Sequence, residues 1–171
     1  PLRAYWYDAR TWEECLRIGH LMADSAQKLL EGVQPQSAPA IHCTCRPVSF
    51  PVDSDILWQV FLFSPLNYQT DRAERQVTVP INLINIGDCQ IATIPGEALP
   101  NIGFYLKRKM NGKHPMLFGL TNDAFGYILT KIDYQSFPRY DYVSRVCLGE
   151  MTGEILVENI LEMIQHAPVP E

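Results

Sequence analysis

Hydrophobic residues recur along the chain at two spacings, and each spacing predicts one type of element. Steps of three and four residues predict an amphipathic helix that begins after Thr11 and ends near Gly32, and a second one from Thr152 to the proline-containing tail. Thr11 and Glu14 match a capping box for the first helix. The two apolar stripes consist of Trp12, Cys15, Leu16, Met22, Ala26, Leu29, Leu30 and Val33, and of Ile155, Leu156, Ile160, Leu161 and Ile164.

Alternation with a period of two predicts strands in the middle of the chain. It runs over residues 41–52 but is interrupted by Pro47, which places this strand at a sheet edge or at a bulge. Two apolar runs, 77–86 and 89–94, flank a Gly-Asp pair and predict a hairpin. A shorter apolar run at 116–120 predicts a buried strand.

A third helix is expected between these strands. It begins after Pro95-Gly96 and ends near Met110, before the stop signal Asn111-Gly112. Residues 53–66 fit either a short helix or an exposed apolar loop, and the polar stretch 67–76 fits a surface turn. The order of elements predicts an α/β fold, a mixed sheet flanked by helices, and 171 residues suit a single domain over 1–171.

Composition narrows the function classes. A net charge of −5 argues against a nucleic-acid partner, and no apolar run reaches the roughly 20 residues of a transmembrane segment. The five cysteines are odd in number and irregularly spaced, which favours a reducing compartment such as the cytoplasm. We expect them to be small core residues, with His42 on the opposite face of its strand from Cys43 and Cys45.

Candidate chemistry is concentrated at two strand ends. Glu97 follows a strand at the expected start of a helix, where it is either a functional carboxylate or a stabiliser of the first helical turn. The second cluster begins after the run at 116–120 with Asn122 and Asp123, which suit a turn or a binding loop. It continues with four tyrosines that either pack or form a wall of polar-tipped rings, namely Tyr127, Tyr134, Tyr140 and Tyr142. The four histidines form no metal motif.

Read in order, these segments resemble the C-terminal half of the catalytic domain of neutral ceramidases. That family has a P-G-E segment before a helix, then G-L-x-N, then Y-[IV]-x-T, and then a tyrosine-rich stretch ending in R-Y-E. The corresponding segments here are Ile94-Pro95-Gly96-Glu97, Gly119-Leu120-Thr121-Asn122, Tyr127-Ile128-Leu129-Thr130 and Arg139-Tyr140-Asp141. The similarity is best over residues 84–149 and weak before Pro80.

The resemblance implies a zinc-dependent amide hydrolase in which Glu97 and Tyr127 are metal ligands. A carboxylate and a phenolate are acceptable oxygen ligands for Zn²⁺. It also implies a substrate pocket near Asn122, Tyr134 and Tyr140, and an amide or lipid-like substrate. The family's two zinc-binding histidines lie in its N-terminal half, which nothing in this chain matches. A missing N-terminal segment or a partner chain would therefore supply them, and Pro1 would mark a cut edge of a larger catalytic domain.

Three functional hypotheses follow. The first is a ceramidase-like zinc amidase of which this chain forms part, inactive by itself because two ligands leave most of the usual four zinc positions unfilled. The residues after Glu97 differ from the threonine-rich continuation of typical ceramidases, so the acyl-amide substrate stays open. The second is a non-catalytic ceramidase-like fragment or binding module without a complete metal site. The third pairs Glu97 with Asp123 or Asp133 as an acid and a base.

Overall fold

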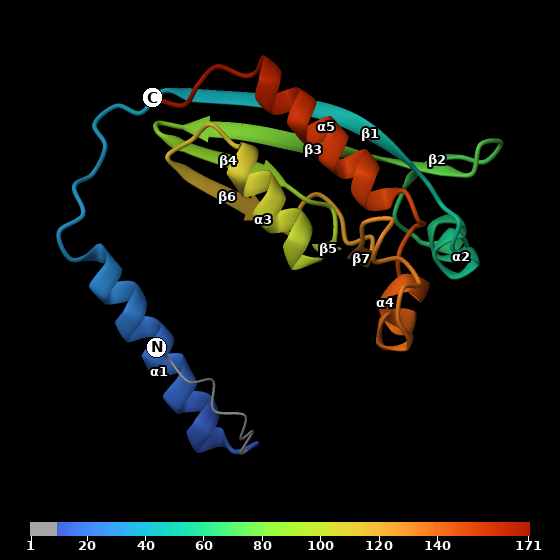
Figure 1. Cartoon of the computed structure of the whole chain (residues 1–171), viewed down its shortest axis with the longest axis horizontal. Coiled ribbons are helices and arrows are strands. Elements are labelled where there is room, and N and C mark those ends of the chain that lie inside the picture. The colour runs from blue at the N-terminus through green and yellow to red at the C-terminus, as the bar shows by residue number, and fades with distance from the viewer. Residues whose placement is uncertain (1–9) are drawn as a thin grey trace. The chain divides into compact units, whose positions relative to one another are not determined.

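The structure, a computed structural model, describes residues 10–171 apart from the side chain of Tyr140. The chain divides into two units, Pro1–Ser37 and Ala38–Glu171, which are described separately (Figure 1). Within the described residues, no helix combines the length and the apolar character that crossing a bilayer requires.

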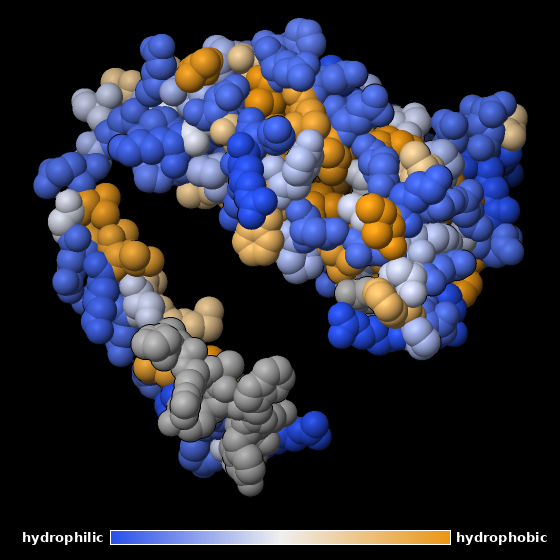
Figure 2. Space-filling model, in the orientation of Figure 1, coloured by the Kyte–Doolittle hydropathy of each residue, from blue (hydrophilic) through white to orange (hydrophobic). Residues whose placement is uncertain are grey.

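In the first unit, the predicted helix is α1 (Trp12–Leu30). The Thr11 hydroxyl accepts a hydrogen bond from the Glu14 backbone N–H at 3.2 Å, as expected of an N-cap. The Glu14 carboxylate accepts from the Arg17 guanidinium at 2.6 Å and 2.7 Å. Hydrophobic side chains gather along one side of this helix (Figure 2), and none of the residues of α1 is buried.

The main sheet of the second unit has five strands. They are β1 (Ile41–Pro51), β2 (Gln69–Asp71), β3 (Gln76–Ile86), β4 (Cys89–Thr93) and β6 (His114–Phe118). Their order is β1-β3-β4-β6, and β2 also pairs with β3. The β4–β6 pair is parallel and the others are antiparallel, which confirms the mixed sheet and the 77–94 hairpin. β1 is the expected edge strand, but its ladder runs unbroken through Pro47 opposite Pro80, so no bulge forms.

Two helices cover one face of this sheet. α5 (Thr152–His166) packs against β1 and β3, and α3 (Pro100–Lys109) packs against β6 and α5 (Figure 1). The core between helices and sheet includes Phe50, Ile81, Leu106 and Leu156, each fully buried. Burying one such side chain contributes about 2 kcal/mol, and this face therefore holds the unit together.

The remaining helices lie near the ends of the strands. Residues 53–66, which fitted two interpretations, contain α2 (Asp55–Phe63), capped by the Ser54 hydroxyl. The expected turn at 67–76 includes the strand β2. The tyrosine-rich stretch contains the 3₁₀ helix η1 (Pro138–Tyr140), which leads into α4 (Asp141–Arg145).

Two burial predictions were wrong. Cys15, Cys43 and Cys45 are exposed, whereas Cys89 is half-buried and Cys147 is buried. The apolar phase of β1 shifts at Pro47 without a bulge, so Cys43 and Cys45 face away from the core while Val48 and Phe50 face into it. Strand β6 is also not buried on both faces, because Met116 and Phe118 are 43% and 47% exposed. These strands carry more apolar side chains than one core accommodates.

Candidate functional site

The two proposed metal ligands lie side by side. Glu97 belongs to β5 (Glu97–Ala98) and Tyr127 to β7 (Tyr127–Ile128), and the two short strands form a parallel pair in which Glu97 is the direct partner of Tyr127. The prediction that Glu97 begins a helix was wrong, since α3 starts at Pro100. The carboxylate therefore does not stabilise a first helical turn, and its neighbour across the ladder is a phenol.

Glycines allow these two strands to approach. A Cβ added to Gly96 would lie 2.5 Å from the Gly126 carbonyl oxygen, and one added to Gly126 would lie 2.2 Å from the Val146 carbonyl oxygen. Gly126 also has a φ of +78°, in the left-handed region that favours glycine. The glycines directly before Glu97 and Tyr127 are thus required by the backbone that carries these side chains.

Backbone hydrogen bonds fix the register of the pair. The Glu97 N–H donates to the Gly126 carbonyl at 2.8 Å, and the Leu99 N–H donates to the Ile128 carbonyl at 3.0 Å. On the other side, the Tyr127 N–H donates to the Val146 carbonyl at 2.8 Å. The site is therefore held in register by three backbone segments, those of Glu97, Tyr127 and Val146.

The Glu97 carboxylate affects the ionisation of the Tyr127 hydroxyl. The nearby Glu97 carboxylate raises the pKa of Tyr127 above its ordinary value, with smaller contributions from burial and from Tyr142. The Tyr142 ring stands edge-on to the Tyr127 ring, with centroids 5.8 Å apart. Glu97 is exposed and Tyr127 half-buried, and neither makes a side-chain hydrogen bond with another described residue. A cation between the two oxygens would relieve their repulsion and lower the pKa of Tyr127.

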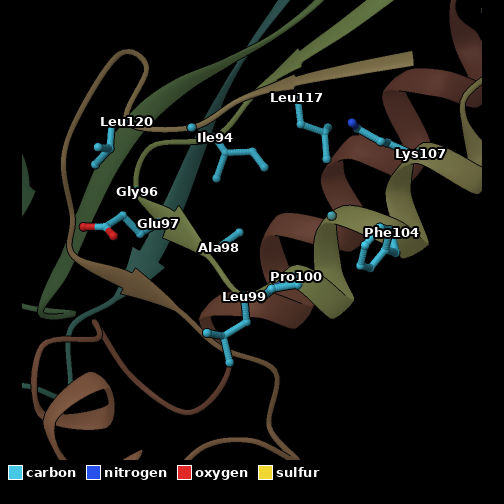
Figure 3. Close-up of a pocket in the computed structure, with 12 residues that line it drawn as sticks. Ile94, Gly96, Glu97, Ala98, Leu99, Pro100, Phe104, Lys107, Leu117 and Leu120 are labelled. Atoms are coloured by element: carbon cyan, nitrogen blue, oxygen red, sulfur yellow. The ribbon is translucent and has the colours of Figure 1, made fainter. Parts of the chain in front are cut away.

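A cavity of about 550 Å³ lies beside Glu97, between β5, α3 and the end of β6. Figure 3 shows Glu97 near one end and Lys107 at the other, with the Glu97 carboxylate directed away from α3. The wall between them is apolar and includes Ile94, Ala98, Leu99, Phe104, Leu117 and Leu120. Sequence reasoning did not identify this cavity. Gly103 and Lys107, four residues apart on one face of α3, belong to its wall, but no sequence motif marks the cavity.

Asn122 has a structural role in addition to the predicted one. Its side-chain amide donates to the Pro80 carbonyl at 2.8 Å and to the Thr93 hydroxyl at 3.2 Å. These bonds attach the loop before Tyr127 to the sheet where β4 has ended, and Asn122 holds a φ of +75° there. A substrate contact of Asn122 stays a prediction.

The other two predicted tyrosines lie on the segment that follows β7. Tyr134 is half-buried, and its pKa is raised by burial first and then by Cys147 and Asp53. Its ionisable neighbours thus differ from those of Tyr127. Tyr140 lies in η1, and its side chain is outside the described atoms. A contact of Tyr134 or Tyr140 with substrate also stays a prediction. Tyr142, another of the four candidate tyrosines, packs its ring against that of Tyr127.

The carboxylates considered as partners of Glu97 are engaged elsewhere. Burial raises the pKa of Asp123, and hydrogen bonds from the Ala124 N–H and the Tyr68 hydroxyl oppose that shift. Asp133 accepts hydrogen bonds from Asn101 and from Thr130, both at 2.7 Å.

The histidines lie on separate elements, and His42 is hydrogen-bonded to Thr44 on the face opposite Cys43. Within residues 10–171, no three His, Cys, Asp or Glu side chains converge to hold a metal ion.

Solved structures, but not family models or curated sequences, contain proteins similar to this chain. No family model matches the chain, and neither does any curated protein sequence. Among solved structures, the neutral ceramidase from Pseudomonas aeruginosa is similar over 99% of this chain and 36% of that one, with 13% identity and a TM-score of 0.61. A ceramidase complexed with C2 matches 55% of this chain and 16% of that one, with 21% identity and a TM-score of 0.46. The chain thus spans about a third of the length of the Pseudomonas enzyme and has the fold of that part of a neutral ceramidase.

Proposed function

We propose that this chain forms part of a zinc-dependent amide hydrolase of ceramidase type, in which Glu97 and Tyr127 provide two of the metal ligands. The observation that carries the proposal is the direct pairing of these residues across β5 and β7, although a helix and a strand separate them in the chain. Two oxygen donors without competing hydrogen bonds suit a divalent cation.

The arrangement assigns a task to each group of this chain. Zinc bound here would polarise the amide carbonyl and activate a water molecule. Glu97 would supply a carboxylate oxygen held by the backbone register described above. Tyr127 would bind as the phenolate, and its neighbour Tyr142 would restrict the rotation of its ring. The apolar cavity beside Glu97 would hold an apolar part of an N-acyl amide and would keep the amide group at the end of the cavity where Glu97 lies.

The remaining ligands would come from a polypeptide segment outside this chain. Structural zinc sites have four protein ligands and catalytic sites usually have three, so a pair is insufficient for tight binding. The similarity of this chain to 36% of the Pseudomonas ceramidase supports a larger catalytic domain. We therefore expect the isolated chain to be inactive toward N-acyl amides.

Zinc content tests the proposal. In the complete protein, defined as the polypeptide encoded by the whole gene that contains this sequence, Glu97→Gln and Tyr127→Phe are each expected to lose stoichiometric zinc and amidase activity. Glu158→Gln and Tyr105→Phe make the same chemical changes at exposed positions on α5 and α3 and should retain both. Full zinc in both site variants would refute the ligand assignment. A wild-type protein that folds without zinc and without activity would favour a non-catalytic ceramidase-like binding module.

A further inference from the structure

The cavity beside Glu97 contains a basic group that the proposed metal site does not use. Among the described residues that line it, Glu97 and Lys107 carry charged side chains, and the others are apolar or glycine. Figure 3 shows the two at opposite ends of the cavity. The Glu97 carboxylate is directed away from α3, whereas the Lys107 side chain extends from α3 toward the strand that carries Leu117. The end of the cavity away from Glu97 is therefore marked by a positive charge.

The Lys107 ammonium group makes no ion pair or hydrogen bond with another residue that the structure describes. In residues 38–171, the other lysines each have a contact partner, which is Tyr105 for Lys109, Asp88 for Lys113 and Glu150 for Lys131. The dipole of α3 does not depend on Lys107 alone, because Arg108 and Lys109 occupy the same last turn. The charge of Lys107 is therefore available to a molecule bound in the cavity.

Gly103 keeps the space between α3 and β6 open. It lies one turn before Lys107 on the same face of α3, and a Cβ added there would meet Leu117 Cδ1 at 3.7 Å, an ordinary contact distance. The volume of about 550 Å³ falls within the roughly 300–1,000 Å³ typical of small-molecule sites. Because an α-helix rises about 1.5 Å per residue, the part of α3 from Pro100 to Lys107 is about 10 Å long. The cavity thus has room for a short apolar chain.

We propose that this cavity selects N-acyl amides whose apolar part ends in a carboxylate, and that the Lys107 ammonium group binds this carboxylate. The inference rests on the proposed function, because the amide would be cleaved at the Glu97 end. Hydrolysis would break the amide C–N bond and add the elements of water, giving a carboxylic acid and an amine, and Lys107 takes no part in that step. One ammonium group balances one negative charge, so a carboxylate suits it better than a doubly charged phosphate monoester.

Binding of octanoate and octanol tests the charge at this end of the cavity, because the two probes share a chain length and differ in the anionic group. Calorimetry on the complete protein, with zinc removed by a chelator and the fold checked by circular dichroism, gives the ratio of the octanol Kd to the octanoate Kd. At low ionic strength this ratio should fall about fivefold in Lys107→Gln and should be retained in Lys107→Arg. Arg108→Gln makes a similar charge change at the next residue, outside the lining, and should leave the ratio unchanged. Equal ratios in the wild type and Lys107→Gln, or a wild type that does not bind octanoate, would overturn the proposal.

Filling the cavity provides an independent test of where the probes bind. Gly103→Leu places a side chain in the space beside Leu117 and should weaken the binding of octanoate and octanol alike. Gly103→Ala adds a single methyl group at an ordinary contact distance and should weaken both probes much less. Octanoate binding that is unchanged in a folded Gly103→Leu protein would contradict the proposal, because the anion would then bind outside this cavity.

Hydrolysis separates this inference from the proposed function. The probes are the N-methyl monoamide of sebacic acid, which has a free carboxylate, and the methyl ester of the same compound. The ratio of their kcat/KM values should be about fivefold higher in the zinc-containing wild type than in Lys107→Gln. Octanoate binding that depends on Lys107, in a protein without zinc or activity, would keep the carboxylate site and refute the metal site. Zinc bound by Glu97 and Tyr127, with equal kcat/KM ratios in the wild type and Lys107→Gln, would do the reverse.

Discussion

Replacing Gly126 with alanine would disrupt the backbone that brings Glu97 and Tyr127 together. The new Cβ would lie 2.2 Å from the Val146 carbonyl oxygen and 3.0 Å from Val146 Cγ1, so one strand must move. The φ of +78° adds the cost of holding an L-residue in the left-handed region, about 1–2 kcal/mol. Overpacking against backbone adds about 1–3 kcal/mol.

The reduced entropy of the unfolded chain offsets only part of this cost. Gly→Ala gains about 0.4–1 kcal/mol where the native conformation permits it, so the net loss is about 2–4 kcal/mol. For a domain of this size each kcal/mol lowers Tm by about 2–4 °C, and we expect a decrease on the order of 10 °C. Because β7 would shift from β5, the raised pKa of Tyr127 should also move back toward its ordinary value of 10.0.

Thermal unfolding followed by circular dichroism and an absorbance titration of the tyrosines measure the two effects. Gly103→Ala is the matched control, since its Cβ would meet Leu117 Cδ1 at an ordinary 3.7 Å. Within α3 this change should raise stability by roughly 0.5–1 kcal/mol. A Gly126→Ala protein with the Tm of the wild type and an unchanged Tyr127 titration would refute the reasoning.

Three further predictions concern charge, core packing and the loop. Glu97→Gln removes the largest cause of the raised Tyr127 pKa, so phenolate absorbance should develop at lower pH. The folded wild type favours the neutral phenol, so the contribution of Tyr127 to stability is complete below about pH 10 and is lost as pH rises through its raised pKa. Leu156→Ala should lower the free energy of unfolding by about 2–5 kcal/mol in urea titrations, against less than about 0.5 kcal/mol for exposed Leu29→Ala. Asn122→Gly tolerates the positive φ but loses the amide hydrogen bonds, so it should lower the free energy of unfolding by about 1 kcal/mol in the same assay. Asn122→Ala also strains the backbone at +75° and should lower it by about 2 kcal/mol. Equal losses would show that this backbone is not strained.

The long elements were predictable because their signals are local. The capping threonine at Thr11, the stripe that buries Leu156 and the hairpin at Gly87 each depend on a few consecutive residues. Burial was not predictable in the same way. The shift in the apolar alternation at Pro47 is typical of a bulge, but it arises because β1 carries apolar residues on both faces. The sequence of a single strand cannot distinguish these two causes.

The site was predicted as motifs, not as geometry. The sequence indicated Glu97 and Tyr127 through the family resemblance, but placed Glu97 in a helix that begins three residues later. Their pairing depends on close approaches at Gly96 and Gly126, which involve residues distant in the chain. The cavity near Lys107 has no sequence motif, because it forms between three elements, each of which contributes separate residues.

The position of zinc in crystals of the complete protein tests the central claim most directly. Anomalous scattering at the zinc edge should give one strong peak within about 2 Å of both a Glu97 carboxylate oxygen and the Tyr127 phenolate oxygen. The other ligands should come from residues outside this chain's sequence. A fully occupied zinc peak elsewhere, with the Glu97 and Tyr127 oxygens free of metal, would contradict the account.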